Sequence, residues 1–127
     1  MTKNELISEC LKMPETFMDY PFDATTAVIK LKKNGKMFAF LDYVSPEKIK
    51  KNCGQDAPVS DNDLFLNLKC EPALCMFLRE KYKAVLPGYY CNKNYWNTII
   101  VDKDVPLDEL RKMIQLSFEL VSSVKKK

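Results

Sequence analysis

The chain has 127 residues, of which 46% are hydrophobic and 29% are charged, a balance typical of a globular domain rather than a disordered or fibrous chain. No apolar run approaches the ~20 residues that cross a bilayer, and the first residues lack the apolar core of a signal peptide, so we expect one cytoplasmic domain over residues 1–127 with no membrane contact. Twenty basic residues against seventeen acidic residues leave a net charge of only +3, far below the strongly basic balance of many nucleic-acid binders.

The chemistry-bearing residues favour no metal, cofactor or catalytic site. The five cysteines contain no C-x-x-C pair and the chain has no histidine, whereas structural zinc needs four such ligands in close pairs. We expect reduced cysteines that pack as small hydrophobes, at least Cys10, Cys70 and Cys75. Cys91 lies two residues before Lys93, which would lower the pKa of its thiol, but no general base accompanies it. The sequence therefore predicts a protein that is not an enzyme.

The N-terminal third predicts a helix and a hairpin. Thr2 and Glu5 form a capping box, and the apolar spacing that follows predicts a helix over residues 3–13, ended by Pro14. An acidic and aromatic run at 19–23 predicts a packed loop. Strands are predicted over 25–32 and 36–43, joined by a two-residue turn at Asn34 and Gly35. That register assigns four residues to the core face: Ile29, Leu31, Phe38 and Phe40.

The middle of the chain is less regular. Residues 44–62 predict a long loop with one helical turn. Leucines alternating over 64–68 predict a strand that directs Asn67 and Lys69 to the polar face of the sheet. A helix is predicted from Pro72, with four residues in its buried stripe: Leu74, Phe77, Leu78 and Tyr82.

The last third predicts a second hairpin and a final helix. Strands around 88–91 and 97–102 would be joined through Asn92, Lys93 and Asn94. The final helix begins at 104–106 and carries a stripe of Leu107, Leu110, Ile114, Ser117, Val121 and Val124. The order α-β-β-β-α-β-β-α predicts an α+β fold of two layers, with helices over one face of a largely antiparallel five-stranded sheet and the other face exposed.

Segments along nearly the whole chain resemble the MmcQ/YjbR-like family of small bacterial proteins. They are DYPFD at 19–23, TAV at 26–28, KMFA at 36–39, LNLKC at 66–70 with Pro72, PGY at 87–89, Asn92-Lys93, WNT at 96–98 and DVP at 104–106. The resemblance implies a two-layer α+β fold similar to type III secretion chaperones, and DNA binding through a double wing of two hairpins.

Two positions depart from that family pattern. Tyr90 and Tyr95 stand where family members usually carry histidine. Tyrosine keeps an aromatic ring and one polar tip but does not titrate near neutral pH, so proton or metal chemistry is not expected there. Stacking or packing remains compatible with both residues.

Two functional hypotheses stay open. In the first, the two hairpins contact the phosphates of nucleic acid through lysines while aromatic rings stack on unpaired bases. The residues expected to bind nucleic acid or another ligand, under either hypothesis, are Lys30, Lys32, Lys33, Lys36, Asn67, Lys69, Tyr90, Asn92, Lys93, Tyr95 and Trp96. In the second, the exposed sheet face binds a protein or a small acidic ligand, and the protein is a monomer or weak dimer. For Trp96 and Tyr89, packing is the favoured interpretation, with the indole buried under the last helix.

Overall fold

The computed structural model describes residues 1–55, 57–89 and 91–123, and these form an α+β fold with four helices and six strands. The elements in chain order are α1 (Lys3–Leu11), β1 (Thr16–Asp19), β2 (Ala27–Leu31), β3 (Met37–Val44), α2 (Pro46–Cys53), β4 (Asp63–Lys69), α3 (Pro72–Lys81), β5 (Val85–Pro87), β6 (Trp96–Ile100) and α4 (Leu107–Ser122). None of the helices in the described ranges is both long enough and apolar enough to cross a membrane.

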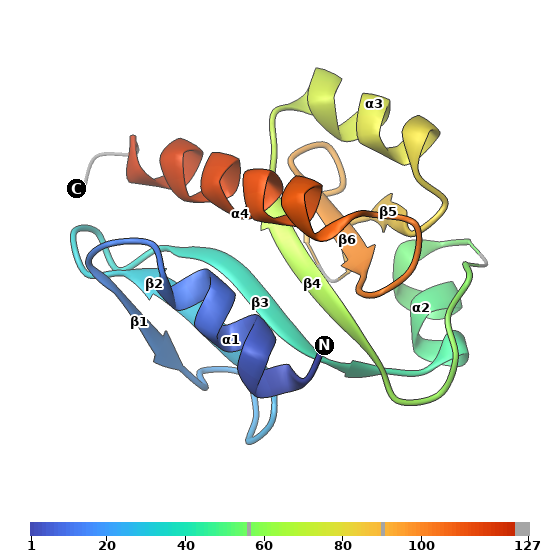
Figure 1. Ribbon diagram of the computed structural model, residues 1–127, viewed down its shortest axis with the longest axis horizontal. Coiled ribbons are helices and arrows are strands. Elements are labelled where there is room, and N and C mark those ends of the chain that lie inside the picture. The colour runs from blue at the N-terminus through green and yellow to red at the C-terminus, as the bar shows by residue number, and fades with distance from the viewer. Residues whose placement is uncertain (56, 90, 124–127) are drawn as a thin grey trace.

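The strands form one antiparallel sheet in the order β1-β2-β3-β4-β6-β5. Figure 1 shows α4 and α1 lying across the same face of this sheet. Side chains of α3 and α4 meet Leu68 and Ile99 on that face, so α3 belongs to the same layer. The two-layer α+β prediction is therefore confirmed, with a sixth strand added at the β1 edge.

The N-terminal helix forms as predicted. The Thr2 hydroxyl accepts a hydrogen bond from the Glu5 N–H at 3.1 Å, and the Glu5 carboxylate accepts one from the Thr2 N–H at 2.8 Å. Leu6, Ile7 and Cys10 are buried beneath the helix. The capping box therefore begins α1 at the predicted position.

The predicted register of the first hairpin is wrong. Ile29 aligns with Ala39 rather than Phe40, and Lys30 aligns with Met37 rather than Ala39, because the register shifts between Ile29 and Lys30, where β3 has one extra residue. Strand β2 also ends at Leu31, so the connection covers residues 32–36 and not two residues. Gly35 has φ +70°, the conformation that glycine adopts without strain, whereas Asn34 does not share it.

Three further elements differ from the prediction. Residues 16–19 form strand β1, which pairs with β2, and residues 46–53 form a complete helix whose N-cap is Ser45. The second hairpin uses 85–87 rather than 88–91, so 88–95 is a long connection. Phe77, which was predicted to be buried, is 56% exposed. Cys75 is buried on α3 instead.

Candidate functional site

The sheet face opposite α1 and α4 is filled at its centre by aromatic rings. Phe40 lies 5.9 Å from Phe65 and 6.2 Å from Trp96, and Phe65 lies 4.7 Å from Tyr89, measured between ring centroids. All four rings belong to residues that are at most 9% exposed. Trp96 therefore packs on this face against Phe40, and not under the last helix. The expectation of an open polar face does not hold at the centre of the sheet.

Asn67 lies inside this layer and not on a surface. Its side chain is completely buried and donates a hydrogen bond to the Tyr89 carbonyl at 2.8 Å. Its amide oxygen accepts one from the Thr98 hydroxyl at 2.5 Å, and that hydroxyl accepts from the Tyr89 N–H at 2.7 Å. Asn67, expected to contact a ligand, instead fastens the 88–95 connection to the sheet.

The lysines of the first hairpin divide into two pairs. Lys30 forms an ion pair with Asp19 at 3.0 Å, and Lys33 donates to the Ser122 carbonyl at 2.8 Å, at the end of α4. The Lys32 and Lys36 ammonium groups are exposed, without a hydrogen-bonded partner within residues 1–55, 57–89 and 91–123. The second pair is thus the part of this hairpin available to a ligand.

Hydrogen bonds to α2 and α3 hold the 88–95 connection in place. The Lys93 ammonium donates to the carbonyls of Asn52 at 2.9 Å and Gly88 at 2.8 Å. Arg79 of α3 donates to the Asn97 side chain at 2.7 Å, to the Trp96 carbonyl at 3.1 Å and to the Lys93 carbonyl. Sequence reasoning missed Arg79, because an arginine on a helix carries no signal of the loop it will bind.

Four of the predicted residues line one hollow at the end of the sheet. This sheet-end hollow has a volume of about 540 Å³ and is lined by Lys69, Glu71, Pro72, Asn92, Tyr95, Trp96, Leu120 and Ser123. Lys69 and Trp96 are paired across β4 and β6, and Tyr95 is 45% exposed. The hairpin tip lies against the same last turn of α4, through Lys33 and Asn34 (Figure 1). Tyr90 lies outside the described residues.

A second hollow lies on the aromatic sheet face. This aromatic hollow has a volume of about 390 Å³, and its floor consists of Phe40, Phe65 and Tyr89. Its rim is formed by the exposed rings of Phe22 and Tyr43, with Lys48, Met37 and Cys91. One edge carries four polar residues: Asp23, Thr25, Thr26 and Asp42. The 19–23 run predicted a packed loop, but nothing in its pattern indicated that Phe22 and Asp23 would border a hollow.

Hydrogen bonds keep both carboxylates of that edge ionised. Asp23 accepts from the N–H groups of Thr26 at 2.6 Å and Thr25 at 2.9 Å, and these bonds lower the pKa of its carboxyl. Burial opposes ionisation of Asp42, but hydrogen bonds from Lys3, Thr25 and the Tyr43 N–H outweigh it, so the pKa of that carboxyl also lies below its ordinary value.

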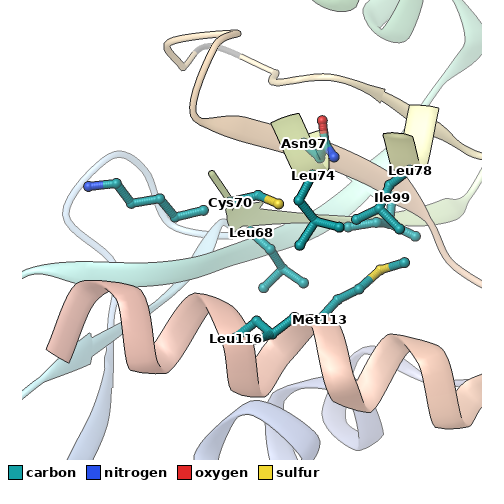
Figure 2. A pocket seen from close by; sticks show the side chains of 9 residues that line it. Leu68, Cys70, Leu74, Leu78, Asn97, Ile99, Met113 and Leu116 are labelled. Atoms are coloured by element: carbon teal, nitrogen blue, oxygen red, sulfur yellow. The ribbon is translucent and has the colours of Figure 1, made fainter. Parts of the chain in front are cut away.

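The crevice between α3 and α4 is a packing defect rather than a ligand site. Figure 2 shows Leu74 and Leu78 on one side and Met113 and Leu116 on the other, with Leu68 between them in this view. Its enclosed volume is about 20 Å³, close to the space needed by a single water molecule, whereas ligand pockets measure roughly 300–1,000 Å³.

All five cysteines are free; four are buried and Cys91 is half-buried. Cys10, Cys70 and Cys75 are buried and unpaired, as predicted. Burial raises the pKa of the Cys10 thiol to about 12, and burial also raises the pKa of Cys91 despite the nearby Lys93. The expected lowering of the Cys91 pKa is therefore overturned, because desolvation outweighs the single lysine. No group of three metal-ligating side chains occurs in the part of the chain that the structure describes.

Comparison with known proteins relates the fold to a family. The YjbR family model matches residues 11–120, which contain the whole sheet and nearly all of α4. The chain belongs to the YjbR family. A curated relative, uncharacterized protein YyaQ of Bacillus subtilis, is 30% identical over 122 residues, covering 94% of this chain and 98% of its own length. The YjbR-family resemblance drawn from the motifs is thus confirmed.

Solved structures of two bacterial proteins superpose on this fold. A crystal structure of a Pseudomonas syringae protein superposes with a TM-score of 0.77 at 26% identity, covering 94% of this chain and 98% of that one. A Deinococcus radiodurans protein with a DUF419 domain superposes with a TM-score of 0.75 at 30% identity, covering 96% and 79%. The descriptions of these proteins state no ligand or activity.

Proposed function

We propose that this YjbR-family protein is a non-enzymatic DNA-binding protein that holds single-stranded segments at the sheet-end hollow. The observation that carries the proposal is that Lys69, Asn92 and Tyr95 line one open hollow, beside a hairpin tip with two unpaired lysines. Lysines neutralise phosphates without reading sequence, and an exposed aromatic ring stacks on any unpaired base. This combination fits a sequence-tolerant interface better than a base-reading one.

Contacts inside the protein limit which residues of the two proposed wings are available to DNA. Lys32 and Lys36 serve the first wing, since Lys30 is paired with Asp19 and Lys33 with the end of α4. The second wing offers Asn92 and Tyr95, because the Lys93 ammonium already holds Asn52 and Gly88. In this proposal the second wing supplies stacking and amide contacts, and the first wing supplies charge.

The charge contribution is tested with a fluorescent oligothymidine across a salt series. The K32E/K36E variant should bind more weakly and reduce the salt slope of log K by about 1.4, since each single-strand phosphate contact contributes about 0.7. The matched control K83E/K112E changes the net charge equally on exposed lysines elsewhere. Unmeasurable binding by the wild type at low salt, or equal losses in both double variants, would contradict the proposal.

The stacking contribution is tested separately. The Y95A variant should lose about tenfold in affinity for oligothymidine and much less for duplex DNA, because paired bases offer no free ring face. Tyr20, which is 43% exposed in a loop, provides the matched control Y20A. Equal losses for single-stranded and duplex DNA would remove Tyr95 from the mechanism.

A further inference from the structure

We propose that the aromatic hollow is a binding site for a planar aromatic molecule that carries an anionic group. This site is separate from the sheet-end hollow, because it opens on the sheet face between the 22–26 loop and α2. The inference therefore goes beyond DNA binding and does not depend on it.

The walls of the hollow suit a flat ring. Phe40 and Phe65 form the floor at 3% exposure each, while Phe22 and Tyr43 at the rim remain 59% and 49% exposed. Phe22 meets Phe40 edge-on at 5.9 Å, with an angle of 84° between the ring planes. An aromatic ligand would gain offset or edge contacts with several rings and would remove the two exposed ones from water.

The two carboxylates of the polar edge are already bound by donors of the protein itself and offer little to a cationic ligand. Asp42 already accepts hydrogen bonds from Lys3 at 3.0 Å, the Tyr43 N–H at 2.8 Å and the Thr25 hydroxyl at 2.8 Å. Asp23 likewise accepts from two N–H groups and from the Thr26 hydroxyl at 3.0 Å. Each carboxylate thus has four donor groups of the protein within hydrogen-bond distance, so little acceptor capacity remains for a ligand.

Lys48 is the remaining charged group of the hollow. It lies in the first turn of α2, is exposed, and its ammonium has no hydrogen-bonded partner among the residues described. Its three N–H donors are free to bind a phosphate or carboxylate. The ligand chemistry that follows is a flat ring over Phe40 and Phe65 with its acidic substituent at Lys48.

The probe for this chemistry is 1-anilinonaphthalene-8-sulfonate, an aromatic anion that fluoresces when it leaves water. The folded wild type should bind it saturably with one site per chain, and both F22A and K48Q should weaken binding at least about fivefold. Phe77 is 56% exposed on α3 and Lys51 is exposed on α2, so F77A and K51Q are the matched controls. The far- and near-UV circular dichroism of each variant verifies that the probe reports a folded protein.

Competition then identifies the source of the ligand. Displacement of the probe by adenosine monophosphate assigns a nucleotide, and displacement by 4-hydroxybenzoate assigns an aryl carboxylate. Displacement by benzyltrimethylammonium, failure of both anions, or equal affinity of F22A and F77A would overturn the proposal. The outcome is independent of DNA binding, since F22A and K48Q should bind oligothymidine normally and K32E/K36E should bind the probe normally.

Discussion

At the scale of single residues, the buried serine of α4 can occupy an apolar stripe because its hydroxyl is fully hydrogen-bonded. The Ser117 side chain is fully buried, and its hydroxyl donates to the Phe38 carbonyl at 2.6 Å. The same oxygen accepts from the Lys69 N–H at 2.8 Å. Ser117 therefore links α4 to β3 and β4 at the point where these strands stop pairing with each other.

Replacement of Ser117 by alanine removes a single oxygen atom but should lower the stability of the fold noticeably. We expect S117A to lower the free energy of unfolding by about 1–3 kcal/mol, because the Phe38 carbonyl and the Lys69 N–H would both lose their partner in a buried setting. Urea denaturation measures this change. The control S123A removes an exposed hydroxyl and should have little effect, so equal midpoints for the two variants would contradict this role.

At the scale of elements, the 88–95 connection depends on one close approach. A Cβ atom at Gly88 would lie 2.8 Å from the Trp96 Cβ and 2.9 Å from the Trp96 carbonyl oxygen. The backbone at Trp96 cannot move away freely, because Arg79 donates to its carbonyl and β6 pairs with β4. Glycine is required here by space rather than by backbone conformation.

A single methyl group should therefore disturb the whole connection. We expect G88A to lower the free energy of unfolding by about 1–3 kcal/mol through overpacking. The variant should also weaken oligothymidine binding, since Asn92 and Tyr95 would shift. N94A alters an exposed position of the same connection and serves as the control; a G88A protein as stable as N94A would show that the approach is tolerated.

At the scale of the molecule, an ion pair joins the first helix of the chain to the last. Arg111 of α4 donates to the Glu9 carboxylate of α1 at 2.9 Å and 3.2 Å, and Lys12 donates to it at 2.8 Å. Arg111 and Lys12 together lower the pKa of Glu9 from 4.5 to about 2. This ion pair thus links α1 to α4 directly.

This pair predicts a specific dependence of stability on pH. Because the folded-state pKa is the lower one, the contribution is complete above pH 4.5 and is lost as the pH falls toward 2. Since Arg111 is half exposed and its charge is screened by solvent, we expect the contribution of the pair to be small. The difference in unfolding free energy between wild type and E9Q should therefore be present at pH 6 and nearly absent at pH 2. A difference that persists at pH 2, or that E80Q on α3 reproduces, would contradict this assignment.

The parts that sequence reasoning predicted correctly depend on contacts between near neighbours. The capping box of α1, the leucine alternation of β4 and the apolar period of α4 each depend on residues a few positions apart. The local sequence pattern is therefore enough to predict them. The two-layer class followed from their order. Strand β1 and helix α2 were missed because residues 16–19 and 46–53 form their elements by pairing with β2 and by packing of Ile49 and Cys53.

For the candidate site too, some features could be predicted from the sequence and others could not. The aromatic and basic residues that line the sheet-end hollow were identifiable from their types and their positions at predicted strand ends. Sequence alone did not reveal that Lys30, Lys33 and Lys93 bind partners inside the protein, or that Asn67 is buried. Each of these outcomes depends on a group that is distant in the chain.

The sequence pattern was sufficient to predict the kind of protein: an α+β fold of the YjbR family with unpaired cysteines. Local periodicity and turn-forming residues are sufficient to predict the fold class. The tertiary structure alone decided which lysines are free and where the hollows lie. The aromatic hollow requires Phe22, Phe40, Lys48 and Phe65 to meet from a loop, two strands and a helix, and the sheet register that brings them together is set by packing across the whole molecule.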